Sequence, residues 1–399
     1  MKNDSNSLFS AFGPLLPFMA VVFFGILATA MTLPVIPRHV HDALGQGTTM
    51  VGVVMGVQFI SAFFSRMWAG HVADAQGPRR VAVMGMLAAA STGIVYLVSL
   101  QFADRPQLAL ALVIAARLLT GMAESFLITG LLAWSMARLG PAHTGKVLGW
   151  VGVAIFASFG AAAPLGVALH ERFGLAGLAI AAMLIPLLPL VGVMLMHVEK
   201  PGTHERPRFL SVVRDVKLPG LGLMLCSSAY AMITVFAVLL FVQRGWGGGA
   251  LALTAMGAGF IVARLLFGHL PDQVGGARVT LYAALVEALG LAMIWAAPGP
   301  EVAWLGAALG GGGYALAFQA LGVEAVRRAP PQSRGAAMGA YVAFQDIAMA
   351  MAGPVGGVFA QAMGLGSVFL VGAVSAAAGM WVAVRLMGNG SPGSPPSRG

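Results

Sequence analysis

Twelve apolar stretches, each long enough to cross a lipid bilayer as a helix, constrain this chain more than any other feature of its sequence. Crossing the hydrocarbon core takes about 20 apolar residues in a helix. The stretches cover approximately residues 15–37, 49–71, 81–101, 107–128, 145–168, 175–197, 218–242, 250–271, 279–297, 302–325, 336–361 and 365–387. Only 9% of the 399 residues are charged, against roughly a quarter in a soluble domain, so most of the surface must face lipid. We therefore expect an all-α membrane protein.

The basic residues lie mostly in every second loop. If the N-terminus is cytoplasmic, the cytoplasmic segments hold 16 of the 23 Lys and Arg residues, and the outside loops hold four. The remaining three, Arg66, Arg117 and Arg264, lie within spans. Cytoplasmic loops of membrane proteins carry an excess of Lys and Arg, so we predict a multi-pass protein of a bacterial-type inner (plasma) membrane with both termini in the cytoplasm. The net charge of +9 then reflects topology, and we expect no nucleic-acid partner.

A polar connection divides the chain into two halves of six spans each. Residues 198–217, between spans six and seven, hold the densest basic cluster and predict a cytoplasmic linker. We expect an N-terminal six-helix bundle over residues 1–197 and a C-terminal one over residues 218–387. The tail, residues 388–399, is rich in Gly, Ser and Pro and predicts disorder.

The two halves carry an internal repeat. Residues 65–81 (SRMWAGHVADAQGPRRV) and 263–279 (ARLLFGHLPDQVGGARV) share seven identities without a gap. At this offset of 198 the identical pairs are Arg66 and Arg264, Gly70 and Gly268, His71 and His269, Asp74 and Asp272, Gly77 and Gly275, Arg80 and Arg278, and Val81 and Val279. At a second offset of 190, Gly145, Gly149, Pro164 and Gly166 correspond to Gly335, Gly339, Pro354 and Gly356. These matches indicate a duplicated six-span unit, as expected where two halves are related by an axis along the membrane normal.

The first copy of the repeat contains a motif that resembles a known family. Gly70 to Arg80 (GHVADAQGPRR) is similar to the loop signature Gly-x-Leu-Ala-Asp-x-x-Gly-Arg-Arg/Lys-Arg/Lys of the major facilitator superfamily, with Val72 for Leu and Pro78 for the first basic residue. The resemblance implies a major facilitator fold, with twelve transmembrane helices in two six-helix halves. It also implies a conformational latch at Gly70, Asp74, Gly77, Arg79, Arg80, Gly268, Asp272 and Arg278. The alternative is a polar turn that only obeys the charge asymmetry of the loops.

Three charged residues near the middle of spans are candidates for proton coupling. Ionisable groups at this depth are costly unless they face a cavity or a partner. Arg117 and Gly121 in span four resemble the Arg-x-x-x-Gly pattern of proton-coupled exporters, and Glu124 lies on the same helix face. Asp346 lies in span eleven, where a carboxylate can bind and release a proton as its access to water alternates. The alternative is that these charges are satisfied structurally. The family resemblance implies a peripheral place for span nine, so for Glu287 an interfacial or packing role is the stronger interpretation.

The glycines and prolines of spans five and eleven resemble an antiporter motif in degraded form. Residues 149–166 (GWVGVAIFASFGAAAPLG) have Ala163 where Gly usually precedes the proline, and small residues for helix packing are an equal alternative. We also expect a substrate cavity between the halves. Its candidate lining residues are Gln58, Tyr230, Thr234, Tyr314, Gln319, Tyr341 and Gln345.

Together these features predict a secondary transporter of a small organic solute, working by proton-coupled export of sugar-like or drug-like compounds. The alternative is a proton symporter for the uptake of a sugar or an organic acid. An enzyme should show clustered catalytic residues at a membrane face, and His39, His41 and Asp42 in one loop are better read as loop polarity. We therefore expect no enzymatic activity, no cofactor and no metal site. The expected partners are the lipid bilayer, protons and the solute, and the family resemblance implies a monomer.

Overall fold

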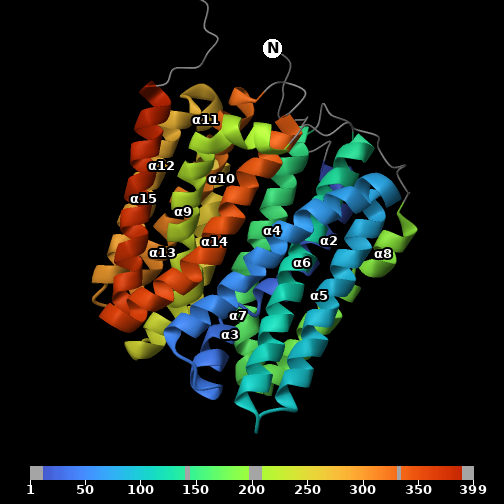
Figure 1. Cartoon of the computed structure of the whole chain (residues 1–399), viewed down its shortest axis with the longest axis vertical. Coiled ribbons are helices and arrows are strands. Elements are labelled where there is room, and N and C mark those ends of the chain that lie inside the picture. Colours follow the sequence, from blue (N-terminus) through green and yellow to red (C-terminus); the bar gives the residue numbers. More distant parts are fainter. Residues whose placement is uncertain (1–11, 140–143, 197–208, 330–333, 389–399) are drawn as a thin grey trace, which may run out of the picture.

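A computed structural model of the chain describes residues 12–139, 144–196, 209–329 and 334–388. Within these ranges the regular structure is helical throughout, as expected. Residues 198–208 of the predicted linker and 389–399 of the predicted tail lie outside the described residues. Figure 1 shows the C-terminal half, yellow to red, at the left and the N-terminal half, blue to green, at the right. We call the two ends of the molecule the α11 end, at the top of this view, and the α3 end, at the bottom.

The N-terminal half contains the first six predicted spans. Its helices are α2 (Phe12–Ala30), α3 (Ile36–Arg38), the π-helix η1 (His39–Ala43), α4 (Thr48–Gln76), α5 (Pro78–Leu100), α6 (Pro106–Leu139), α7 (Thr144–Leu184), η3 (Ile185–Leu187) and α8 (Leu190–Leu195). Spans five and six merge within α7, where the backbone bends at Gly174 with φ 64°. A positive φ of this kind favours glycine.

The C-terminal half contains the other six. Its helices are α9 (Phe209–Gln243), α10 (Gly249–Phe267), α11 (Leu270–Gln273), α12 (Gly276–Ala296), α13 (Pro300–Arg328), α14 (Arg334–Met363) and α15 (Leu365–Gly388). Helix α9 begins at Phe209, whereas the sequence predicts that residues 209–217 belong to the linker. Val216 in this segment is fully buried, and its packing helps extend the helix beyond the apolar stretch.

By length and hydropathy alone, fewer helices qualify as membrane spans than the twelve predicted from the sequence. Among the described residues, nine helices are long and apolar enough to cross a membrane, and one of them, Trp150–Met194, covers spans five and six. The apolar part of α2 described here is shorter, Leu15–Ala30. Helix α13 is not among the nine, although it is 29 residues long, and it carries four consecutive glycines, Gly310–Gly313. These three elements account for the difference from the twelve predicted spans.

The backbone repeats the duplication seen in the sequence. Gly77, between α4 and α5, has φ 92° and ψ 149°, and its counterpart Gly275, before α12, has φ 100° and ψ 139°. Side chains rarely adopt this region of backbone space, so both turns require glycine. The matching angles indicate that the two halves form this turn in the same way.

Glycines allow the helices within each half to approach closely. A Cβ atom on Gly121 of α6 would lie 1.9 Å from the carbonyl oxygen of Gln58 in α4, and one on Gly290 of α12 would lie 2.5 Å from that of Gly306 in α13. Such contacts between backbones replace the hydrophobic driving force that lipid does not supply between helices. They fix the distance between α4 and α6, which carry the polar site described below.

The two halves are closed against each other at the α3 end. A Cβ on Gly52 of α4 would lie 2.0 Å from the carbonyl oxygen of Gly353 in α14. Thr48 donates a hydrogen bond to the Gly357 carbonyl at 3.1 Å, and Thr49 donates one to Gln361 at 2.9 Å. Backbone contact of this kind leaves no room for a solute between α4 and α14 at this end.

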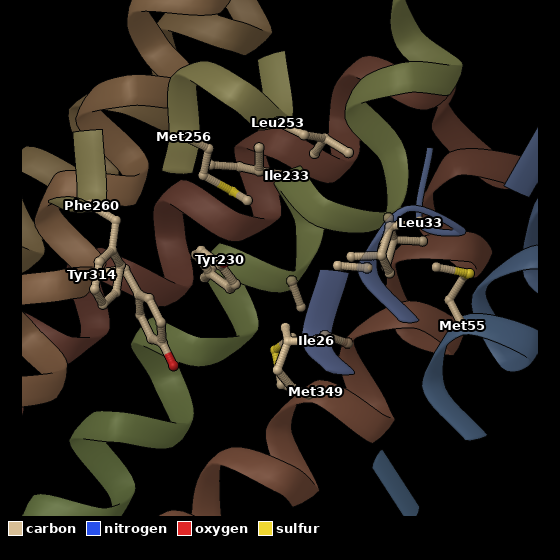
Figure 2. Close-up of a cluster of buried hydrophobic side chains, with 14 of the residues drawn as sticks. Ile26, Leu33, Met55, Tyr230, Ile233, Leu253, Met256, Phe260, Tyr314 and Met349 are labelled. Atoms are coloured by element: carbon tan, nitrogen blue, oxygen red, sulfur yellow. The ribbon is translucent and has the colours of Figure 1, made fainter. Parts of the chain in front are cut away.

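Apolar side chains from both halves fill the adjoining interface. Figure 2 shows Leu33 and Met55 of the N-terminal half facing a cluster from α9, α10 and α14. The labelled members from those helices include Ile233, Leu253, Met256 and Met349, all of which are buried. Helix α9 is buried around its whole circumference from residue 229 to residue 241. The closed end is therefore sealed by hydrophobic packing as well as by backbone contact.

Gly121→Ala is expected to lower the stability of the N-terminal half by about 1–3 kcal/mol, because the added methyl group overpacks a rigid backbone contact. Gly339→Ala is the matched control, since a Cβ at Gly339 meets nothing within 4 Å. Thermal unfolding of the two purified variants in detergent measures the difference. Equal melting temperatures would show that α4 and α6 are not in close contact at Gly121.

Candidate functional site

A buried polar network joins three helices in the middle of the N-terminal half. Arg117 of α6 is fully buried and donates to the Thr32 hydroxyl at 3.1 Å and to the Gln58 side-chain oxygen. The Gln58 amide then donates to Glu124 at 2.7 Å. Thr29 donates to the other carboxylate oxygen of Glu124 at 2.9 Å. Arg117 and Glu124 are therefore linked through Gln58 without direct contact, and the network balances one positive with one negative charge.

The position of Gly121 explains why Gln58 reaches Arg117. Gly121 lies against the backbone of Gln58, because the missing side chain lets α4 approach α6. Gln58 was predicted as a cavity residue, and the structure places it, 2% exposed, inside this network.

An ion pair connects the two halves. Arg66 Nε donates to Asp346 Oδ2 at 3.1 Å, and Nη2 donates to Oδ1 at 3.2 Å. The Asp346 side chain is 5% exposed and that of Arg66 is 22% exposed. A bidentate arrangement of this kind is the strongest that a guanidinium forms with a carboxylate. Removing one partner of a buried pair typically costs about 3–5 kcal/mol, so this contact contributes to holding α4 against α14.

Arg66 is not among the functional residues predicted from the sequence. Two signals were available, its place within a span and its identity with Arg264 in the repeat. Neither indicates Asp346 as the partner, 280 residues away in the chain. Arg117 and Glu124 both contact Gln58 of α4, the helix that also carries Arg66. The three predicted proton-coupling residues are therefore all in contact with side chains of α4.

The predicted cavity tyrosines pack inside the C-terminal half. Tyr230 and Tyr314 stack with ring centroids 4.3 Å apart, and the Tyr314 hydroxyl is 3.3 Å from that of Ser227. Tyr341 is fully buried and donates to the Phe318 carbonyl at 2.6 Å. In this conformation the Tyr314 hydroxyl contacts a serine side chain and the Tyr341 hydroxyl contacts the backbone. Their assignment to the substrate cavity stays a prediction.

The other predicted cavity residues differ in their surroundings. Thr234 is buried and donates to the Tyr230 carbonyl one helical turn away. Gln319 of α13 donates to the Gly268 carbonyl at 2.7 Å, while its own side-chain oxygen is buried without a hydrogen-bond partner. Gln345 is partly buried, next to Asp346 in the chain. Of these three, Gln319 is the one whose side-chain oxygen is buried without a hydrogen-bond partner among the described residues.

Glu287 is a buried carboxylate outside the site. It is fully buried in α12, both oxygens lack a hydrogen-bond partner, and it lies near the Cys226 thiol. A Cβ on Gly313 would lie 2.8 Å from the Glu287 Cβ, so α13 closes over it. This buried position inside the C-terminal bundle differs from the interfacial place that was one expectation from the sequence, and the packing role stays a prediction.

The loop signature is held by contacts within its own half. Arg79 donates to the Met194 carbonyl at 2.6 Å, and Arg80 donates to Gln76 at 3.2 Å. Gly268 ends α10, Asp272 lies in α11, and Arg278 is exposed in the first turn of α12. Gly70 and Asp74 lie in the last part of α4, before the turn at Gly77. The latch between halves stays a prediction.

The histidines at the α3 end do not form a metal site within the described residues, where no three His, Cys, Asp or Glu residues gather. His41 contacts the Gln46 carbonyl at 2.8 Å, and Asp42 lies 3.8 Å from Arg38. Burial, and then the neighbouring His170, lower the pKa of His39 below its ordinary value. A lowered pKa favours the neutral form of His39 at pH 7.

Comparison with known proteins identifies the family. The family model for the Major Facilitator Superfamily matches residues 18–351 and 220–399. An uncharacterized MFS-type transporter of Salmonella typhimurium is 39% identical over 372 residues, covering 92% of this chain and 95% of the relative. One of Burkholderia mallei is 39% identical over 395 residues, covering 96% of each.

Two solved structures share the fold at low sequence identity. The nucleoside transporter NupG, as a point mutant, has a TM-score of 0.77 at 13% identity, covering 93% of this chain and 99% of its own. The human organic anion transporter MFSD10 has a TM-score of 0.66 at 16% identity, covering 92% and 98%. The family model, the two bacterial relatives and the shared fold lead to one conclusion: this chain belongs to the major facilitator superfamily and is a membrane transporter, not an enzyme.

Proposed function

We propose that this transporter is proton-coupled and exports a small organic solute by alternating access between its two halves. The observation that carries the proposal is the bidentate ion pair between Arg66 and Asp346, because it joins the two halves within their membrane-spanning helices. A carboxylate in this position changes the contact between the halves when its charge changes. That is the coupling that a proton-driven carrier requires.

The proposed step is a proton transfer to Asp346. While Asp346 is ionised, its two oxygens accept two hydrogen bonds from Arg66 and hold α4 to α14. A proton that binds one oxygen neutralises the carboxylate, and the charge attraction to Arg66 is lost. The halves then separate at the α3 end and close at the other. Release of the proton re-forms the pair, and Glu124, linked to Arg117, provides a second proton site.

The orientation follows from the distribution of basic residues. We place both termini in the cytoplasm of a bacterial-type inner membrane, so that the α11 end faces the cytoplasm. The closed α3 end then faces outward, and the conformation described here is the one from which a cytoplasmic solute would enter. A monomer contains both halves of the pathway and is sufficient for this cycle.

The direction of transport rests on the sequence motifs of spans five and eleven. In the structure Gly353 lies against Gly52, and a Cβ on Gly166 would lie 2.1 Å from the Met31 carbonyl. Small residues thus lie at close contacts between helices. The contact at Gly353 is one between the two halves, which is what an antiporter motif would require. Uptake by proton symport remains the second candidate, because the same ion pair serves a carrier working in either direction. A nucleoside and an organic anion are the cargoes named for the two structural neighbours, which makes small polar organic solutes reasonable test compounds.

Asp346→Asn is expected to reduce substrate-induced proton movement at least tenfold, since an amide cannot exchange the proton that couples the cycle. Inverted membrane vesicles with a pH-sensitive dye measure this, using a panel of sugars, nucleosides, organic anions and cationic drugs. Asp104→Asn is the matched control, because Asp104 is an exposed loop carboxylate. If Asp346→Asn moves protons as the parent does, the coupling assignment fails.

A disulfide across the α3 end is expected to block transport. Thr49 and Gln361 face each other across the two halves, with side-chain oxygens 2.9 Å apart. In a Cys226→Ser background, Thr49→Cys with Gln361→Cys should cross-link under oxidation, lower solute flux at least tenfold and recover with a reductant. The single Thr49→Cys variant controls for oxidation alone. Full flux through a completely cross-linked protein would contradict alternating access at this end.

A further inference from the structure

Arg264 lacks the acidic partner that its counterpart in the other half has. Arg66 and Arg264 occupy equivalent positions of the repeat, and the glycines eleven residues after each adopt the same backbone angles. Arg66 binds Asp346. Within the described ranges of the chain, Arg264 forms neither an ion pair nor a side-chain hydrogen bond. The two halves therefore differ at one functional position.

The difference originates in the opposing helix. At the offset of 190 that relates spans five and eleven, the residue corresponding to Asp346 is Phe156. The duplicated unit thus carries a carboxylate at this position of span eleven and a phenylalanine at the matching position of span five. The Arg264 guanidinium lies beside Gly152 of α7, where an added Cβ would be 3.8 Å from Cζ and 3.9 Å from Nη2. The cation therefore points at the other half, across the interface through which a solute must pass.

Pairing of the charges within the spans leaves Arg264 without an anionic partner among the described residues. Arg66 is balanced by Asp346, and Arg117 is balanced by Glu124 through Gln58. Glu287 is closed inside the C-terminal bundle under α13 and forms no ion pair among the described residues. A partly buried cation in a membrane-spanning helix is costly without an anionic partner. An anion that enters from outside the protein would supply that partner.

We propose that Arg264 binds the anionic group of the transported solute, so that the substrate is a small organic anion carrying a carboxylate, phosphate or sulfonate. This inference rests on the proposed pathway between the halves. A guanidinium fork matches the paired oxygens of such groups and forms charge-assisted hydrogen bonds to them. The anionic group of the solute thereby pairs with Arg264 as the Asp346 carboxylate pairs with Arg66. Gly152, without a side chain, leaves space beside the guanidinium.

Direct binding tests this proposal without requiring turnover. Thermal unfolding of the purified full-length protein in detergent is measured with pairs of similar compounds that differ in charge: benzoate with benzamide, and gluconate with glucose. At least one anion should raise the melting temperature of the parent while its neutral partner does not. Arg264→Gln should weaken that anion's binding about tenfold or more, the scale expected for a lost charge-assisted hydrogen bond. Arg385→Gln is the control, because Arg385 lies over the Trp381 ring at the end of α15, away from the interface.

Gly152 allows a second, sharper comparison. Gly152→Asp places a carboxylate next to Arg264 and should reduce anion binding, because it supplies the missing partner. Gly152→Asn has the same size without the charge and should bind anions more tightly than Gly152→Asp. The proposal is overturned if neither anion stabilises the parent more than its neutral partner, if Arg264→Gln keeps full anion binding, or if the two Gly152 variants bind alike. Anion binding without any proton movement would contradict the proposed coupling but leave this inference in place.

Discussion

A charge inside a lipid bilayer needs a partner, and this requirement organises the interior of the transporter. The pair formed by Arg66 and Asp346 satisfies two charges and at the same time joins the two halves. Arg117 donates hydrogen bonds from two of its three nitrogens to Thr32 and Gln58 inside one half. The need for a partner therefore accounts for two kinds of contact. The Arg117 network lies inside one half, whereas the ion pair of Arg66 and Asp346 depends on the relative position of the two halves. Only the second kind is suited to the proton coupling that we propose.

Glycine determines how closely these groups can approach. Gly121 brings α4 against α6, so that Gln58 reaches both Arg117 and Glu124. Gly52 and Gly353 do the same for α4 and α14 at the closed end. Helix α4 thus takes part in both contacts, one within its half and one between halves. A shift of α4 relative to α14 would leave the Arg117 network intact while it breaks the Asp346 pair, which is the behaviour of a rigid-body carrier.

Much of this was predictable from the sequence, and the failures have a common cause. Hydropathy and the repeat predict the helices and the two halves, because both depend on local composition. A charge within an apolar stretch is also a local feature, and it predicts Arg117, Glu124 and Asp346 as candidates for proton coupling. The partner of Asp346 depends on the rotation and depth of two helices from different halves, which local patterns do not contain. The start of α9 at Phe209 was likewise missed, because the burial of Val216 is a tertiary effect.

The central claim is that the ionised pair between Arg66 and Asp346 stabilises the conformation closed at the α3 end. Spin labels at Asp42→Cys and Gln361→Cys, both exposed positions at that end, report its opening as a distance distribution in lipid nanodiscs. The account predicts a short, narrow distribution in the Cys226→Ser parent and a new population at longer distances when Asp346→Asn or Arg66→Gln is added. An unchanged distribution in both variants would show that the pair does not control the closure, and would contradict the account.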